Sequence, residues 1–457
     1  MAQTTFGVWR QAGYALCNVG RSISEVPTNL LLLYYLTQVL GLQASLAGLA
    51  VALPKIWDAL VDPMFGGWLD RASVRAGRRG PAILLSATGY LVALVLLFSM
   101  QSLQSSPLQL VAAATLLLIA LSVSQTGLGV TQFALSTEMT HDSIGLSKLL
   151  AMSTVSAQVL AVVFGALAPV MVARAGGGAT GYSHMAMQIA LVSAAAFVLF
   201  YFAMRGVPVR RRTAESEDMP LLASLKATLS NRAFYFLMAF VMSVNAGASM
   251  LFGFMPFANH YVLFGSAGDL GVLEAVLGIT VLLGMMVAPQ VARRVEPLRA
   301  MRLANMAVAA FLGLMFFASF LPLWATWGML ACVGLASGII GVLVQASTLV
   351  AARVKTPGVV AVSLGFYLGI MLAGIKLGNS LGGIASGELL QLVGFVPGGG
   401  TQSAWTLQWL RTGYTLVPML FTLAAGVFLH RVKLPREPAR DAGAQLDPAP
   451  ALERGLA

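Results

Sequence analysis

The stretch KIWDALVDP, residues 55–63, places three charged side chains inside an otherwise apolar segment. Lys55, Asp58 and Asp62 are spaced i, i+3 and i+7, so a helix presents all three on one face. Each charge at the centre of a bilayer costs about 2.5–3.5 kcal/mol on insertion scales. The three residues are therefore compatible with a membrane helix when they face a polar cavity and neutralise one another or an ion.

The composition of the whole chain is that of a membrane protein. Of the 457 residues, 58% are apolar and 10% are charged, and the mean hydropathy is +0.82. Soluble domains carry about 45–50% apolar and about 25% charged residues, so an ordinary water-soluble enzyme is excluded. Two cysteines exclude a disulfide scaffold. The four histidines show no zinc spacing, and the sequence has no GxxxxGK[ST] loop. We therefore expect an all-α membrane protein that is not an enzyme.

A membrane-spanning helix needs about 20 mostly apolar residues. Twelve such stretches occur, six on each side of a polar segment. We therefore expect twelve transmembrane helices in two six-helix halves, at 12–37, 44–69, 81–101, 108–133, 148–173, 184–205, 232–263, 271–292, 299–321, 323–352, 358–395 and 407–431.

Basic residues indicate the orientation of these helices. With the amino terminus inside, cytoplasmic segments hold 23 of the 28 lysines and arginines, whereas outer segments hold Arg174 and Arg411. Since cytoplasmic loops are enriched in basic residues, we expect a multi-pass protein of the plasma (inner) membrane with both termini cytoplasmic. This topology and contact with anionic lipid account for the net charge of +11, so no nucleic-acid partner is expected.

The polar segment divides the chain into domains. We expect an N-terminal half at 1–206, a cytoplasmic linker at 207–231 and a C-terminal half at 232–431. A tail at 432–457, rich in Pro, Ala and charge, is predicted to be disordered. Two six-helix halves with a substrate site between them are the pattern of secondary transporters, so the expected partner is a small-molecule solute.

The two acidic residues of the opening stretch have the spacing of a cation site. Asp58 and Asp62 lie one turn apart, so together they can chelate a hard monovalent cation or, when crowded and buried, hold a proton. The alternative is a permanent salt-bridge network, although Lys55 alone cannot neutralise both acids. Gln125 and Thr126 in span 4 can complete a cation shell or make helix-packing hydrogen bonds.

Three further charged residues lie in apolar stretches. Lys376, in the opposite half, can reach Asp58 and Asp62 across the interface and compete with a bound ion, or it can extend its ammonium group to the membrane surface. Arg21 and Glu25 in span 1 are spaced i, i+4, so they either pair with each other or contact the solute.

Several motifs resemble one transporter family. They are KIWDALVDPMFGGWLDR at 55–71, GRRGP at 77–81, ALSTEMT at 134–140, NRAF at 231–234 and KLG at 376–378. The chain resembles the glycoside–pentoside–hexuronide:cation symporters, the melibiose permease family within the major facilitator superfamily (MFS). The similarity extends over nearly the whole chain, and the span 2 motif is its specific part.

The resemblance implies a twelve-helix symporter that works by alternating access. It implies that Asp58 and Asp62 bind the coupling cation, that Thr126 supports them, and that Lys376 participates near that site. Lys55, on the same helix face as the two acids, is a further candidate for coupling. The resemblance also implies a gating loop between spans 2 and 3, formed by Gly66, Asp70, Arg71, Gly77 and Arg78.

The chain departs from the family pattern at positions that affect both ligands. Val61 stands where melibiose-type members have Asn before the second Asp, which removes a carbonyl ligand and favours H⁺ over Na⁺. The family's two sugar-binding aspartates align with Ser22 and near Gly129. A carboxylate accepts two hydroxyl hydrogen bonds, so their absence argues against a disaccharide. Glu25, one turn beyond Ser22, is the candidate replacement.

The sequence thus favours a symporter that couples H⁺ or Na⁺ to import of a small organic solute, works as a monomer and needs no cofactor beyond the ion. Candidate solute contacts are Arg21, Ser22, Glu25, Phe133 and Tyr367. The Met-rich helices leave open an amphipathic solute such as a lysolipid, steroid or glycolipid. A proton-coupled drug exporter and a non-transporting scaffold also remain open, as do the substrate, the ion, the direction and the oligomeric state.

Overall fold

The computed structural model describes residues 7–58, 61, 79–102, 106–140, 143–205, 207, 221–317, 320–352, 354, 364–399 and 401–434. These residues form helices and connecting turns, with no strand in the ranges just given. The first part comprises α1 (Val8–Leu30), α2 (Leu32–Tyr34), the π-helix η1 (Tyr35–Val39), a helix at 44–58, α4 (Gly80–Leu97), the 3-10 turn η2 (Met100–Ser102), α5 (Pro107–Met139), α6 (Ser143–Arg174) and α7 (Gly178–Met204). The second part comprises α8 (Leu221–Ser230), α9 (Arg232–Tyr261), α10 (Ala267–Arg294), α11 (Pro297–Met315), α12 (Leu323–Ala352), α13 (Leu364–Leu392), α14 (Ala404–Tyr414) and α15 (Leu416–Arg431).

Ten helical segments among the described residues are long and apolar enough to cross a bilayer. They coincide with ten of the predicted spans, from Gly80–Leu97 to Ala404–Arg431. The other two predicted spans, 12–37 and 44–69, are helical over Val8–Leu30 and 44–58 in the described part. The chain is therefore a multi-pass helical membrane protein.

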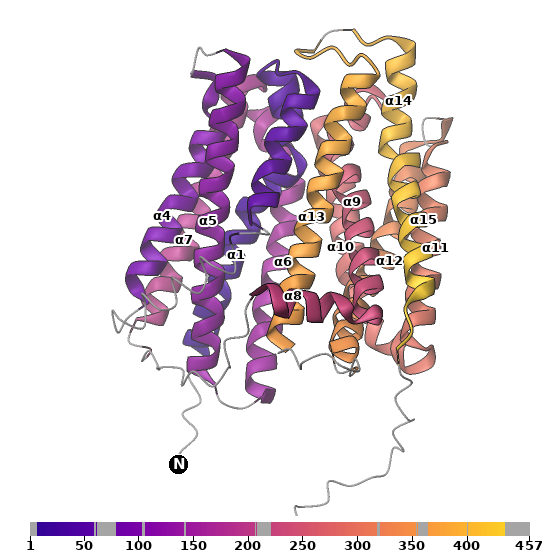
Figure 1. The fold of residues 1–457 in the computed structure, drawn as a ribbon. Coiled ribbons are helices and arrows are strands. Elements are labelled where there is room, and N and C mark those ends of the chain that lie inside the picture. Colours follow the sequence, from indigo (N-terminus) through magenta and orange to yellow (C-terminus); the bar gives the residue numbers. More distant parts are fainter. Residues whose placement is uncertain are drawn as a thin grey trace, which may run out of the picture.

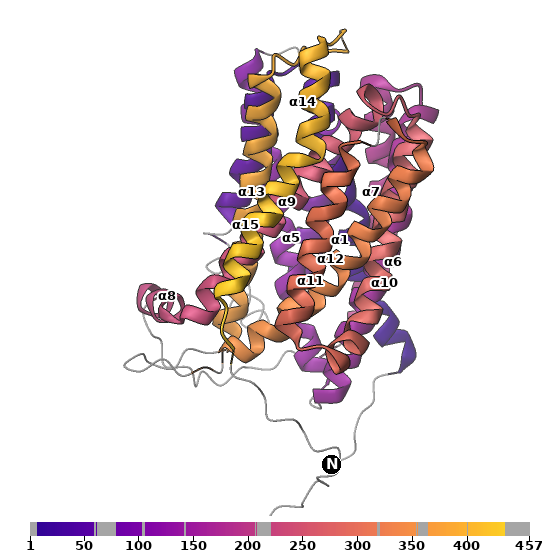
Figure 2. The ribbon, with the colours of Figure 1, turned by 90° about the vertical axis from the view of Figure 1, so that its right-hand side faces the viewer.

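Local sequence explains where several helices begin. Ser106 and Ser266 form capping boxes at the starts of α5 and α10, so each satisfies a backbone N–H that lacks a helical partner. Asn231 caps α9 by accepting a hydrogen bond from the N–H of Phe234, at 3.2 Å. The short α8 runs across the bundle at the end where α1 begins and α15 ends (Figures 1 and 2).

The long helices pack in two groups that follow one another along the chain. In the first group α1 packs on α6 and α7, and α4 packs on α5 and α7; in the second, α9 packs on α13 and α15, and α12 packs on α10 and α11. Figure 1 shows the two groups side by side. Contacts between α6 and α10 join them. The helix at 44–58 also meets α13, where a Cβ at Gly387 would lie 2.7 Å from the Cα of Gly48.

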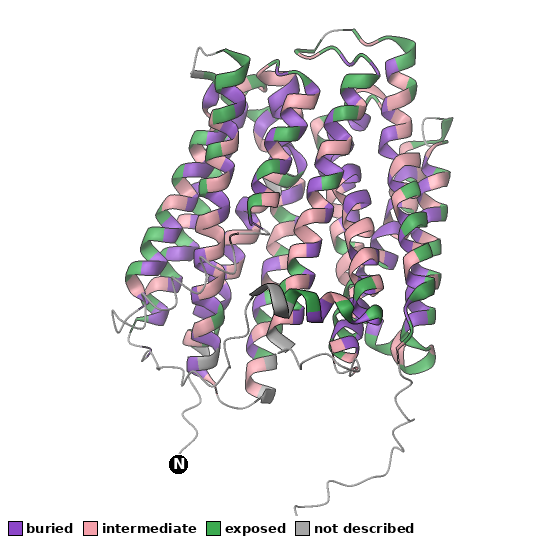
Figure 3. Cartoon of the chain, viewed as in Figure 1, coloured by how far each residue is buried: buried purple, intermediate pink, exposed green. Residues whose placement is uncertain are grey.

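The outward faces of the bundle are apolar. Figure 3 shows exposed residues on the outer surfaces of the helices and buried residues between them. The exposed side chains include Leu85, Leu116, Met286 and Leu372. Because a bilayer interior takes up apolar groups and provides no partner for polar ones, this surface fits a membrane.

Glycine permits the close contact of α10 and α12. A Cβ at Gly338 would collide with the carbonyl oxygen of Val281, whereas a Cβ at Gly341 in the same helix would meet nothing within 4 Å. We expect Gly338→Ala to lower the free energy of unfolding by about 1–3 kcal/mol, because overpacking forces the helices apart. Melting in detergent checks this, with Gly341→Ala as the matched control. Equal melting temperatures for the two variants would contradict it.

Candidate functional site

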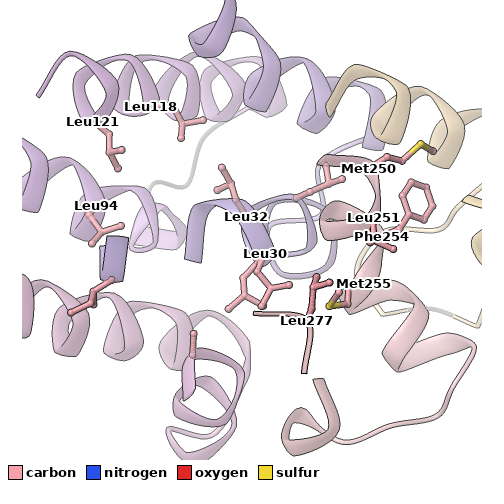
Figure 4. Close-up of a cluster of buried hydrophobic side chains, with 14 of the residues drawn as sticks. Leu30, Leu32, Leu94, Leu118, Leu121, Met250, Leu251, Phe254, Met255 and Leu277 are labelled. Atoms are coloured by element: carbon pink, nitrogen blue, oxygen red, sulfur yellow. The ribbon is translucent and has the colours of Figure 1, made fainter. Parts of the chain in front are cut away.

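A cavity of about 410 Å³ lies between the two helix groups. Its walls come from α1, the helix at 44–58 and α6 on one side, and from α9, α10 and α13 on the other. Figure 4 shows Leu30 and Leu277, two apolar residues of this lining, among buried side chains of α1, α9 and α10. The polar lining includes Ser22, Glu25, Lys55 and Gln158 from the first group, and Asn245, Glu274 and Asn379 from the second. The walls thus offer donors and acceptors on both sides of a small-molecule site.

Asp58 forms a polar contact that joins the two groups. Its side chain is buried, and its Oδ2 accepts a hydrogen bond from the hydroxyl of Ser122 on α5. The same oxygen lies 3.5 Å from Nζ of Lys376 on α13. Lys376 thus reaches Asp58 from the opposite helix group. A cation that binds Asp58 would compete with this ion pair.

Glu25 faces the cavity from α1. Its Oε2 accepts a hydrogen bond of 3.1 Å from Nε2 of Gln125 on α5. The described residues show no ion pair between Arg21 and Glu25, although their spacing allows one. The guanidinium of Arg21 instead lies against Gly129, where an added Cβ would be 3.3 Å from Nη1. Glu25 is thus held by an uncharged partner while its side chain lines the cavity.

Two predicted solute contacts lie away from the cavity. Phe133 is 56% exposed on α5 and does not belong to the cavity lining. Tyr367 is buried where α13 meets α9, with its ring 4.9 Å from that of Phe234 and its hydroxyl 3.4 Å from Nδ2 of Asn231. Its environment is that of a packing residue. Neither aromatic side chain belongs to the lining of this cavity, so their role as solute contacts stays a prediction.

Other predicted residues have mixed outcomes. Ser22, Glu25 and Lys55 line the cavity, whereas Arg21 does not belong to its lining. Thr126 is one turn beyond Ser122 on α5, the residue whose hydroxyl donates to Asp58. The predicted cation ligand Asp62 and the predicted gating-loop residues Gly66, Asp70, Arg71, Gly77 and Arg78 lie outside the described residues.

Sequence reasoning missed three polar residues. Ser122 is one of many hydroxyls in apolar helices, and no spacing rule sets it apart. Glu274 had a usable signal, since it is a lone acid inside the apolar run GVLEAVLGITVLL. Glu138 lies in the ALSTEMT motif, and its carboxylate pairs with Arg79 at 2.7 Å.

Comparison with known proteins identifies relatives across most of the chain. A family model described as MFS/sugar transport protein matches residues 13–436. The isoprimeverose transporter of Lactiplantibacillus pentosus is 26% identical over 222 residues, which cover 48% of this chain and 46% of that protein. A putative glycoside/cation symporter, YagG of Escherichia coli (strain K12), is 33% identical over 86 residues, 19% of each chain. The matched regions thus cover less than half the length of each of these relatives.

Solved structures with the same fold are also transporters. The nucleoside transporter NupG superposes with a TM-score of 0.65 at 14% identity, covering 94% of this chain and 100% of that one. A bacterial homolog to the human lysosomal transporter Spinster, in an inward-facing and unoccupied conformation, gives a TM-score of 0.67 at 16% identity, covering 92% and 95%. At these identities the likeness shows the fold.

Proposed function

Because this chain belongs to the MFS/sugar transport protein family, we propose that it is a cation-coupled symporter of a sugar-like solute. The observation that carries the proposal is the ion pair between Asp58 and Lys376, which joins the two helix groups beside a polar cavity. Each partner comes from a different group, so an ion that binds the carboxylate changes how strongly the groups attract each other. That dependence is what coupling by alternating access requires.

The coupling ion is proposed to be H⁺ or Na⁺, with no other cofactor. In this scheme Asp58, together with Asp62 and Thr126, holds the ion, while Lys376 competes for Asp58 and Lys55 supplies a further positive charge nearby. Ion binding neutralises Asp58 and releases Lys376, and the two groups can then move relative to each other. Val61, in place of an amide ligand, supports H⁺ as the first ion to test.

A sugar-like solute fits the cavity. Its volume of about 410 Å³ falls within the range of about 300–1,000 Å³ typical of small-molecule sites. Hydroxyl, amide and carboxylate groups line it on both sides, and these are the groups that pair with sugar hydroxyls. The names of the relatives support the same class, since one is an isoprimeverose transporter and another a putative glycoside/cation symporter.

The proposal is tested by uptake of labelled isoprimeverose into vesicles that contain the purified protein. An inward gradient of H⁺ or Na⁺ is imposed, and an ionophore that collapses it serves as the control. We expect the gradient to drive accumulation above the outside concentration and the ionophore to abolish it. Equal uptake with and without either gradient would refute a coupled symporter.

The membrane setting is proposed from the basic residues. We place the protein as a monomer in the plasma (inner) membrane, in contact with anionic lipid and with both termini cytoplasmic, and keep the domain boundaries 1–206, 207–231, 232–431 and 432–457. Protease digestion of sealed vesicles of known sidedness tests the orientation. Cleavage of the tail from the outer face of right-side-out vesicles would reverse it.

Lys376→Met is expected to raise the apparent affinity for the coupling cation about tenfold or more. The lysine competes with the ion for Asp58 at 3.5 Å, and unit charges at about 4 Å attract by about 1 kcal/mol in water and about 4 kcal/mol near a protein surface. The measurement is the cation concentration, or the pH, at half-maximal thermal stabilisation. Lys148→Met, at an exposed position on α6, is the control. An unchanged midpoint for Lys376→Met would contradict competition.

A further inference from the structure

Glu274 is an acidic residue of the cavity that the proposed coupling scheme does not use. It lies on α10 and lines the cavity from the second helix group. Its Oε2 is buried and has no hydrogen-bond partner in the described part of the chain. Gly165 of α6 leaves room for it, because a Cβ there would be 2.7 Å from Cγ of Glu274 and 3.1 Å from Oε1. The fold thus accommodates this carboxylate but does not pair it.

Three other acids inside the helix bundle have side-chain partners. Glu138 pairs with Arg79 at 2.7 Å, Glu25 accepts from Gln125 at 3.1 Å, and Asp58 contacts both Ser122 and Lys376. Leaving a buried acceptor unpaired is costly, and the cost is larger for a charged group. Because Glu274 lines the cavity, a ligand that binds there can supply the missing donor.

Glu274 and Glu25 line the same cavity from different helix groups. A carboxylate accepts hydrogen bonds only, and each can take two from hydroxyl groups. The amide side chains of Gln158, Asn245 and Asn379 line the cavity as well and can both donate and accept. A molecule with hydroxyls along both edges can satisfy Glu25 and Glu274 together and so connect the two groups.

We propose that Glu274 is a solute-binding residue that accepts hydrogen bonds from the hydroxyls of a polyhydroxylated, uncharged solute held between it and Glu25. The proposal rests on the proposed function and adds to it a specificity-determining residue. The cavity lining contains two carboxylates, Glu25 and Glu274, and one lysine, Lys55. This excess of acidic groups disfavours an anionic sugar. Solute binding satisfies a carboxylate on each side, which favours closure of the groups around the solute.

The test measures binding of isoprimeverose by the full-length purified protein, by titration calorimetry, in the parent and in Glu274→Gln. Glutamine keeps the size of the side chain and one oxygen, but it loses the charge and half of the acceptor capacity. We expect about tenfold or more weaker binding, because hydrogen bonds to charged groups are among the strong ones. Glu296→Gln, an exposed acid at the start of α11, is expected to bind as the parent does.

Two further readouts separate a binding role from a structural one and from the coupling scheme. Without solute, Glu274→Gln is expected to melt at or above the parent temperature, because the variant no longer buries an unpaired carboxylate. Its thermal stabilisation by the coupling cation should equal that of the parent, because that stabilisation depends on Asp58.

The outcomes are distinguishable. Parent-like isoprimeverose binding by Glu274→Gln, or a lower melting temperature without solute, would overturn the role of Glu274 and leave the coupled symporter intact. If the parent binds neither isoprimeverose nor any other neutral sugar, the proposed solute class fails and the role of Glu274 fails with it. Loss of cation stabilisation in Glu274→Gln would assign this residue to the ion instead of the solute.

Discussion

Asp58→Asn is expected to lower cation-driven accumulation of isoprimeverose about 100-fold or more. Asn keeps the size of the side chain and an oxygen that accepts from Ser122, so the local fold is retained. It removes the charge that holds Lys376 at 3.5 Å and that would attract the coupling ion. Removing one partner of a buried charge pair costs about 2–5 kcal/mol, and each 1.4 kcal/mol corresponds to about a factor of ten.

Exchange of solute without a gradient separates coupling from binding. Asp58 does not belong to the cavity lining, so Asp58→Asn should still exchange labelled for unlabelled sugar across the vesicle membrane. Stabilisation of the variant by the coupling cation should disappear. Glu388→Gln is the matched control, since this acid is exposed on α13, the helix that carries Lys376. Accumulation by Asp58→Asn at the parent level would refute the role of Asp58.

Much of the fold follows from the sequence because each span is encoded locally. Apolar runs of about 20 residues predicted ten spans that the structure contains. The same rule could not place interruptions within a span. The last predicted span, 407–431, is formed by α14 and α15 with a break at Thr415. Pro418 accounts for the break, because it has no N–H to bond to the carbonyl of Tyr414.

The resemblance to a sugar-transporting MFS family is confirmed, because a model described as MFS/sugar transport protein matches residues 13–436. The charged residues of the site were found from sequence because charge is costly in a membrane. Glu25, Lys55, Asp58 and Lys376 all stand out in this way. Asp58 and Lys376 contact each other, and Glu25 and Lys55 share the cavity wall.

Uncharged residues of the site could not be placed from sequence, because they carry no comparable cost in a membrane. Aromatic residues such as Phe133 and Tyr367 occur on any face of a membrane helix, so the sequence does not show which way their side chains point. Ser122 is recognisable only from its contact with Asp58, which the packing of α5 brings about. The sequence lacks the family's two sugar-binding aspartates, at Ser22 and near Gly129, but the fold brings two other carboxylates together. Glu25 and Glu274 face one cavity although they lie on distant segments of the chain.

The ion pair between Arg79 and Glu138 leads to the second large prediction. It joins the start of α4 to the end of α5, and its side chains are only 6% and 5% exposed. Nε of Arg79 lies 3.1 Å from both carboxylate oxygens, and Nη2 lies 2.7 Å from Oε1. Such a bidentate pair is geometrically specific, and neither charge has access to enough water to stand alone.

Glu138→Leu is expected to lower the free energy of unfolding by about 3–5 kcal/mol, because it removes the bidentate carboxylate from a buried guanidinium. Arg79→Met should have a similar effect, because it removes the guanidinium from the buried carboxylate. The double variant Arg79→Met/Glu138→Leu should recover most of the loss, since replacing a whole buried ion pair with apolar side chains is often neutral or stabilising. Chemical denaturation of the purified protein in detergent measures all three.

Arg299→Met, an exposed arginine on α11, is the control and should change stability by less than about 0.5 kcal/mol. The diagnostic quantity is the coupling between the two sites, since a double-mutant cycle isolates the pairwise interaction. If the losses in the two single variants simply add in the double variant, the ion pair is not the cause of either loss. Recovery in the double variant would show that two apolar side chains at these positions stabilise the contact between α4 and α5 about as well as the ion pair does.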